Sequence, residues 1–174
     1  GFYGNAQHGL PTTSGATLAF DSGNGLLQAI IIDNGFLTDL RTGAAGAFAA
    51  DLLARKTVDV VALIGAGRQA MYQLEGLMEV RSPACVRIYN RSEARAVTLA
   101  RTIEDRWDIE AEVVSSVEQA CHDAQVILTT TPSHDPLVKA SWVAPGTHIT
   151  AVGSDLPSKH ELDIELFSIA DVVV

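Results

Sequence analysis

Hydrophobic positions along the chain change their spacing near residue 58. From there, apolar runs rich in β-branched residues alternate with stretches in which apolar side chains recur every three or four positions. The runs predict strands at residues 58–64, 85–89, 110–115, 124–130, 147–152 and 171–174. The stretches between them predict helices at residues 68–80, 92–106, 116–122 and 161–168. Strands that are apolar on both faces and alternate with helices indicate an α/β fold with a doubly wound, Rossmann-type parallel sheet.

The first 57 residues follow a different pattern. Two apolar runs within residues 15–33 flank the turn-forming segment DSGNG, which predicts a β-hairpin. Residues 37–54 favour a helix, with Thr38 as its expected N-cap. The small residues at 43–47 would let another backbone approach closely, although an ordinary alanine-rich packing helix explains them as well.

Composition and charge narrow the class of protein. The 174 residues are 47% hydrophobic and 19% charged, which fits a soluble globular chain with a substantial core. A formal net charge of −9 leaves no basic face for nucleic acid. Neither Cys85 nor Cys121 lies in a CxxC or CxxH pair, so we expect a reduced, cytoplasmic protein without disulfides or a metal site. No apolar stretch reaches transmembrane length and no targeting segment is evident, so no membrane partner is expected.

The segment GAGRQA, residues 65–70, joins the predicted first strand of the sheet to its first helix. That position is the context that the dinucleotide-binding pattern G-x-G-x-x-A requires. Gly65 would permit the turn, Gly67 would let a pyrophosphate approach the backbone, and Ala70 would keep the helix close to the sheet. Unsatisfied amides in the first helical turn, which holds Arg68 and Gln69, would face the anion. A purely structural turn is the alternative.

The end of the second strand indicates which dinucleotide would bind. An NAD site usually has a carboxylate there for the ribose 2′-hydroxyl, but this chain has Asn90, Arg91 and Ser92. Arg91 could clamp or stack over a phosphate-bearing adenosine, and Ser92 could donate to the phosphate. Alternatively, Ser92 is only an N-cap and Arg91 a solvated charge. The sequence therefore favours NADP(H) as the cofactor, with NAD(H) possible.

Other candidate residues follow the fourth and fifth strands, because ligands of open α/β sheets bind outside the carboxyl ends of the strands. These residues are Thr130, Thr131, Pro132, Val152 and Gly153. The threonine hydroxyls could line the nicotinamide side, and Gly153 would allow a close approach. Asp155 would be a carboxylate beside the nicotinamide and is a candidate acid/base. An aspartate that forms an Asx-turn or caps a helix is the alternative.

Several segments, in order, resemble the ornithine cyclodeaminase/mu-crystallin family over nearly the whole chain. They are GLPT (9–12), LTDLRTGAAGA (37–47), GAGRQA (65–70), SWVAPGTHITAVGSD (141–155) and KHELD (159–163). The resemblance implies a homodimer in which residues 1–57 are part of a smaller α+β substrate and dimerisation domain. Residues 58–174 would be most of the inserted dinucleotide-binding Rossmann domain. The family's substrate-binding lysine and the return to the substrate domain are not in these residues, so we expect an internal piece of a longer protein.

The resemblance also implies roles for individual residues. Arg41 would grip the substrate carboxylate, Thr42 would lie near the cofactor phosphates, and Asp155 would do acid/base work. The implied reaction is hydride transfer at a carbon bearing nitrogen in a small amino acid or cyclic imine. A cyclodeaminase, a ketimine reductase and an amino-acid dehydrogenase of the same family all remain open. A catalytically silent binding protein of the mu-crystallin type is an alternative from another class, although the retention of Asp155 and Arg41 argues against it.

Overall fold

The computed structural model describes residues 3–11 and 14–174. Its contacts divide the chain into two compact units, residues 1–41 and 42–174, and the division falls within helix α1 (Phe36–Leu53). The division between substrate and cofactor domains after residue 57 stays a prediction.

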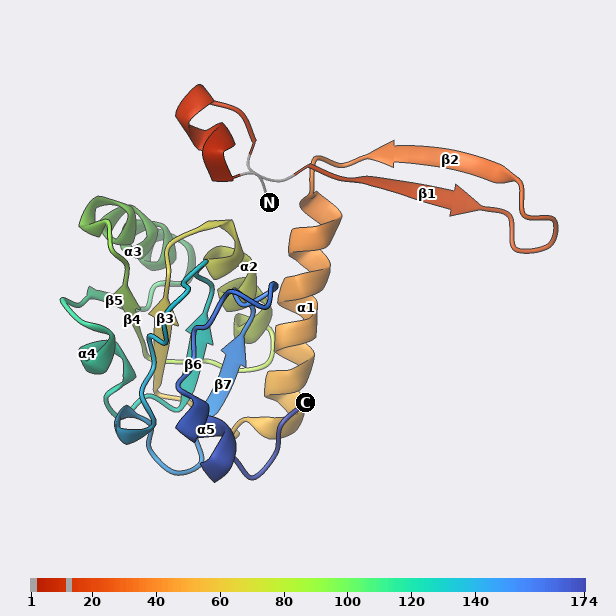
Figure 1. The fold of residues 1–174 in the computed structure, drawn as a ribbon. Helices are drawn as coiled ribbons and strands as arrows, with labels where there is room; N and C mark the ends of the chain where they lie inside the picture. The colour runs from red at the N-terminus through yellow and green to blue at the C-terminus, as the bar shows by residue number, and fades with distance from the viewer. Residues whose placement is uncertain (1–2, 12–13) are drawn as a thin grey trace. The chain divides into compact units, whose positions relative to one another are not determined.

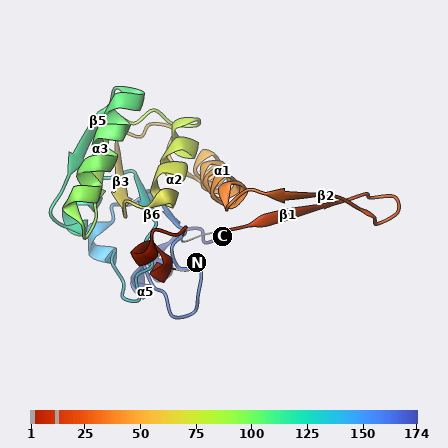
Figure 2. The same cartoon turned by 90° about the horizontal axis from the view of Figure 1, so that it is seen from above.

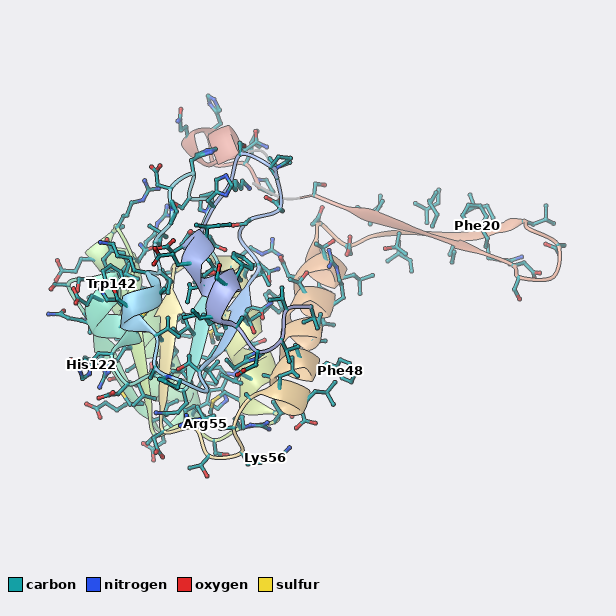
Figure 3. The ribbon with its side chains drawn as sticks, turned by 60° about the horizontal axis from the view of Figure 1, so that its bottom comes forward. Phe20, Phe48, Arg55, Lys56, His122 and Trp142 are labelled. Carbon is teal, nitrogen blue, oxygen red and sulfur yellow. The ribbon has the colours of Figure 1, made fainter. Side chains whose placement is uncertain are left out.

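The first unit contains the predicted β-hairpin. After a short 3-10 helix, η1 (Tyr3–His8), strand β1 (Ala16–Phe20) pairs antiparallel with β2 (Leu27–Ile32) (Figure 1). Oδ1 of Asp21 accepts hydrogen bonds from the turn amides of Gly23 and Asn24, at 2.8 and 3.1 Å. Apolar side chains of the hairpin, including Phe20, are exposed (Figure 3). Turn chemistry therefore explains the hairpin better than burial does. The GLPT motif extends to residue 12, which lies outside the described residues.

Helix α1 begins at Phe36, two residues before the predicted cap. Asp33 accepts hydrogen bonds through Oδ2 from the amide of Leu37 at 2.7 Å and through Oδ1 from the amide of Gly35 at 3.3 Å. The intervening Asn34 and Gly35 have left-handed backbones, which turn the Asp33 carboxylate back toward the start of the helix. The prediction of Thr38 as the N-cap is therefore wrong, because Thr38 lies inside the first turn.

A parallel sheet forms the centre of the second unit (Figure 1). Within the described residues it has five strands, in the order β5-β4-β3-β6-β7. Their bounds are Val60–Ile64 (β3), Cys85–Tyr89 (β4), Glu110–Val113 (β5), Val126–Thr129 (β6) and His148–Ala151 (β7). The strand order reverses between β3 and β6, which is the switch point of a doubly wound sheet. The predicted α/β fold class is confirmed.

The predicted sixth strand, at residues 171–174, is wrong. Helix α5 (Ile164–Ile169) is followed by irregular, exposed backbone, and within the described sheet β7 is an edge strand. A run of valines favours a strand only where a neighbouring strand provides hydrogen bonds and a surface to pack on. Residues 171–174 have no such partner in the described chain.

Helices cover both faces of the sheet (Figure 2). One face packs against α1 from residue 42 onward, α2 (Arg68–Met78) and α3 (Glu93–Trp107). The other packs against α4 (Val117–Cys121), α5 and the loop that contains the 3-10 helix η2 (Ala140–Trp142). Side chains of β3 alternate between these two cores, which is the period of two that a doubly covered strand requires. The ends of these strands are therefore held between two packed hydrophobic cores.

Helices α1 and α2 approach each other closely through glycines. A β-carbon on Gly43 would lie 2.4 Å from the carbonyl oxygen of Tyr72, and one on Gly76 would lie 2.6 Å from the carbonyl oxygen of Gly43. Both distances are too short for any side chain, so the backbone approach predicted from the small residues of α1 is confirmed.

The C-terminal end of α1 is capped by a buried arginine. The guanidinium of Arg81 donates to the backbone oxygens of Ala50 at 2.9 Å, Ala54 at 3.0 Å and Arg55 at 2.7 Å. It also contacts Oδ1 of Asp51 at 3.1 Å. These bonds satisfy carbonyls that the helix itself leaves without donors, and the hydrogen bond from Arg81 lowers the pKa of Asp51.

Candidate functional site

The glycine turn lies between β3 and α2, and its two glycines have different surroundings. Gly65 has φ +110°, and a β-carbon there would lie 2.7 Å from Oγ1 of Thr130. Gly67 is in extended backbone, and apart from Gly67 itself and its two chain neighbours no described atom lies within 4 Å of the place where its β-carbon would be. The fold itself therefore requires glycine at 65, whereas Gly67 borders open space.

The N-terminus of α2 faces this open space. Gly67 is its N-cap residue, and in the described chain this residue has no side chain to bond the first helical amides. Arg68 is exposed in the first turn and Gln69 is partly buried there, while Ala70 is fully buried against the sheet. Uncapped helical amides beside an open glycine are suited to bind a phosphate group. The residues present thus fit the pyrophosphate of a dinucleotide.

Asn90 braces the glycine turn against the end of β4. Its Oδ1 accepts from the amide of Ala66 at 3.2 Å, and its Nδ2 donates to the backbone oxygen of Ser92 at 2.9 Å. Arg91 and Ser92 follow on the surface. Ser92 is the N-cap residue of α3 by position, but in the described chain its side chain makes no capping hydrogen bond. The hydroxyl of Ser92 is therefore not committed to capping.

The loops after β6 and β7 are joined to each other. The amides of Leu137 and Val138 donate to the backbone oxygen of Glu161 at 2.8 and 3.1 Å. The amide of His160 donates to the backbone oxygen of Ser133 at 2.9 Å. Val138 also forms a parallel bridge with Leu162. The two segments that follow the strand ends thus form one hydrogen-bonded structure.

The side chain of Glu161 lies between these loops. Its Oε1 accepts from the amide of Thr131 at 2.6 Å and from the Thr131 hydroxyl at 2.8 Å, and its Oε2 accepts from the amide of Gly153 at 2.8 Å. Glu161 is 1% exposed, so this carboxylate is satisfied inside the protein. Thr130 donates through its hydroxyl to the backbone oxygen of Ile64 at 3.4 Å. Both predicted threonines thus direct their hydroxyls to protein acceptors.

Asp155 lies two residues beyond Gly153 and forms an ion pair with Lys159. Oδ1 of Asp155 contacts Nζ of Lys159; the lysine side chain is 4% exposed and the aspartate side chain 58%. The hydrogen bond from Lys159 lowers the pKa of Asp155. Asp155 does not cap the following helix, because that role falls to Asp163. Nor can it close an Asx-turn on the second residue along, since that residue is Pro157 and has no amide hydrogen.

The remaining predicted residues are on helix α1 and at the ends of β6 and β7. Arg41 is exposed on α1 and is the last residue of the first unit. Thr42 opens the second unit, where its backbone oxygen accepts from Nε2 of Gln73 at 2.8 Å. Pro132 is exposed in the loop after β6, and Val152 extends that end of the sheet through its amide, which donates to Thr129 at 3.0 Å.

A hollow in the second unit is lined by none of these residues. It measures about 670 Å³ and is lined by residues of β4, β5 and α4, including Arg87, whose Nε lies 3.4 Å from Oε2 of Glu112. Among residues 3–11 and 14–174, no group of three His, Cys, Asp or Glu side chains is placed to hold a metal ion. None of the helices in this part of the chain is long and apolar enough to cross a membrane.

A doubly wound parallel sheet, with an open glycine turn and an uncapped helix at its switch point, defines a Rossmann-type nucleotide-binding domain. Comparison with known families gives the same class and refines it. The model of the ornithine cyclodeaminase/mu-crystallin family matches residues 1–174, and the chain belongs to this family. The resemblance noted from the sequence motifs is confirmed.

Three relatives show the range of the family. The mouse ketimine reductase mu-crystallin is 38% identical over 95% of this chain and 51% of its own length. An archaeal alanine dehydrogenase dimer with bound NAD matches with a TM-score of 0.92 and 42% identity, over 98% of this chain and 52% of that one. The Δ1-pyrroline-2-carboxylate reductase of Thermococcus litoralis, in complex with NADH and L-proline, matches with a TM-score of 0.85 and 33% identity, over 91% and 49%. The chain thus spans about half the length of the relatives it matches.

Proposed function

We propose that the protein transfers hydride between a nicotinamide cofactor and a carbon that bears nitrogen, in a small amino acid or cyclic imine. The observation that carries this proposal is the position of Asp155: an exposed carboxylate beyond β7, held by a buried lysine, at the same end of the sheet as the open glycine turn. The family supports it, since a dehydrogenase and two reductases named above act on amino acids or imines. A cyclodeaminase, which forms and reduces an imine in turn, fits the same site.

Bound cofactor would supply or accept the hydride, and residues of this chain would hold it. The amides at the start of α2 would bind the pyrophosphate beside Gly67. Arg91 and Ser92 would bind a 2′-phosphate, because a guanidinium and an uncommitted hydroxyl replace the usual carboxylate at that position. Solved relatives carry NAD or NADH, so the preference for NADP(H) proposed here rests on these two residues.

Asp155 would handle the proton that accompanies the hydride. Asp155 is a carboxylate at neutral pH, and it would accept the proton that the substrate nitrogen gives up as the amine is oxidised to the imine. In the reverse direction the protonated carboxyl returns that proton to the nitrogen. Arg41 would hold the substrate carboxylate in a bidentate grip. The closed loops around Thr131 and Gly153 would help to exclude water, which hydrolyses imines.

The test uses the full-length protein, because substrate binding and dimerisation are proposed for the whole molecule. We expect a cytoplasmic homodimer that binds NADPH more tightly than NADH in fluorescence titrations, and we expect Arg91→Ala to weaken only NADPH. Equal affinities for the two cofactors would refute the preference.

Turnover then separates the activities. Alanine, ornithine, proline and cyclic imines are supplied as substrates while nicotinamide absorbance and ammonia are followed. Net oxidation or reduction identifies a dehydrogenase or reductase, and ammonia release without net redox change identifies a cyclodeaminase. Tight cofactor binding with no turnover on any of these substrates would favour a non-catalytic binding protein and contradict the proposed reaction.

A further inference from the structure

Glu161 is a buried carboxylate to which the proposed reaction gives no role. Resting on that proposed function, we propose that Glu161 is a positioning residue for the nicotinamide half of the cofactor. Its side chain holds the backbones of Thr131 and Gly153 at one fixed spacing, where the loops after β6 and β7 leave the sheet.

The Glu161 carboxylate accepts backbone hydrogen bonds just beyond the point where the pairing of β6 and β7 ends. Thr129 of β6 pairs with Ala151 of β7, and the amide of Val152 still donates to the backbone oxygen of Thr129 at 3.0 Å. Just beyond, the amides of Thr131, two residues after Thr129, and of Gly153, one residue after Val152, both donate to Glu161 instead. Glu161 thus bridges two backbones that are no longer bonded to each other, at the carboxyl ends of the strands where a ligand of this fold binds.

The bonding requires a carboxylate and not only its shape. Both oxygens of Glu161 accept from backbone amides, and Oε1 accepts from the Thr131 hydroxyl as well. A glutamine has the same shape but only one acceptor oxygen, and its NH2 group would face a backbone N–H whichever way the amide turned. One buried amide would then lose its acceptor, and the backbones of Thr131 and Gly153 would shift relative to each other although the backbone bonds further along the loops remain.

The spacing that Glu161 maintains leaves no room for a side chain. A β-carbon on Gly153 would lie 2.0 Å from the carbonyl oxygen of Thr131 and 2.6 Å from Oε1 of Glu161. The loops therefore meet backbone to backbone. The flat nicotinamide ring can pack against this surface only while the backbones of Thr131 and Gly153 keep their positions relative to each other.

The hydrogen bond between Glu161 and Gly153 also joins the two ends of residues 153–161, the segment that carries Asp155. Gly153 lies two residues before Asp155, and Glu161 lies two residues after Lys159. Loss of the Glu161 carboxylate should therefore alter the position of the nicotinamide ring and the geometry of hydride transfer. It removes no group that touches the substrate.

The test compares Glu161→Gln with Glu165→Gln in the full-length protein. Glu165 is an exposed carboxylate on α5 and serves as the matched control. Fluorescence titration should show the dissociation constant for NADPH rising roughly tenfold in Glu161→Gln, as expected for a buried donor that loses its acceptor, and unchanged in Glu165→Gln. The primary deuterium isotope effect on kcat, measured with cofactor deuterated at the transferred position, should also increase in Glu161→Gln.

Three outcomes would overturn the inference. Wild-type protein that binds neither NADPH nor NADH would refute the proposed function and this inference with it. Wild-type binding together with unchanged affinity and isotope effect in Glu161→Gln would refute the inference alone, even if the melting temperature fell. Should Glu161→Gln fail to fold, Thr131→Val removes one of the bonds and is expected to weaken cofactor binding about threefold; unchanged binding in that variant would also refute it.

Discussion

Lys159 reaches back across a turn of the chain so that its buried ammonium group contacts the exposed carboxylate of Asp155. The turn is closed by the amide of Lys159, which donates to the backbone oxygen of Leu156 at 2.9 Å. Because the lysine is fixed inside the protein and the aspartate faces solvent, the pair orients the carboxylate without hiding it. This arrangement suits a group that must exchange protons with a bound substrate.

The ion pair between Lys159 and Asp155 predicts how substitution of Lys159 changes the acidic side of the pH–activity profile. Lys159→Met removes the hydrogen bond that lowers the pKa of Asp155, so this pKa should rise toward its ordinary value. Activity that needs the ionised carboxylate should then begin to fall at a higher pH than in the wild type. Carbon-13 NMR titration of Asp155 and the pH profile of kcat/KM both measure the shift. Lys56→Met, which removes an exposed lysine that pairs with Asp51, should shift neither.

Substitutions of Asp155 and of Arg41 should affect different kinetic constants. Asp155→Asn keeps the shape but removes the titrating proton, so kcat should fall roughly a hundredfold or more while cofactor affinity is unchanged. Arg41→Lys should mainly raise KM, because a point charge cannot reproduce the bidentate grip on a carboxylate. Steady-state kinetics in the full-length protein distinguish the two. Normal turnover in Asp155→Asn would assign the proton transfer to another residue.

The two glycines of the turn predict opposite phenotypes. Gly67→Val places a side chain in open space with an allowed extended backbone, so the fold should persist while cofactor binding is lost. Gly65→Ala meets Thr130 and a backbone φ of +110°, and should lower the free energy of unfolding by about 2 kcal/mol or more. Urea unfolding and cofactor titration are the measurements. A Gly67→Val protein with wild-type affinity would show that the turn is only structural.

Arg81 predicts a stability effect with no direct effect on chemistry. Arg81→Met leaves several helix-end carbonyls of α1 without donors, so the free energy of unfolding should fall by about 3 kcal/mol. Arg101→Met, at an exposed position on α3, should change it by less than about 0.5 kcal/mol. Urea unfolding of both variants checks this. Equal stabilities would mean that water replaces the guanidinium at the helix end.

The fold could be predicted from the sequence because its signals are local and repeated. Each buried strand of the second unit is a short apolar run, and most are followed by an amphipathic helix, so the alternation indicates the parallel sheet. The valines at residues 171–174 gave the same local signal but lack a neighbouring strand in the described chain. Capping preferences favour Thr38, but they do not report the left-handed backbones of Asn34 and Gly35, which bring the Asp33 carboxylate to the start of the helix.

The site could be predicted in part. Gly65 and Asp155 are predicted from the sequence because a strand end followed by a glycine or a carboxylate is a short-range pattern, and their roles stay predictions. Glu161 and Lys159 were not assigned roles, although both lie in KHELD, one of the segments that carried the family resemblance. Whether a glutamate is solvated or buried between two loops depends on backbone contacts across tens of residues, here from Thr131 to Glu161, and periodicity does not report such contacts. The four-residue spacing of Asp155 and Lys159 was the available signal for that pair.

The bridge between Val138 and Leu162 bears on how enzymes of this kind can be redesigned. Loops are usually the parts of a fold that accept insertions and new sequences most readily. Here the amides of Leu137, Val138 and His160 donate across the two loops, so these amide hydrogens should exchange with solvent more slowly than those of the exposed residues 154–158. Libraries aimed at new substrate preferences should therefore vary the exposed residues of these loops and keep the residues that join them.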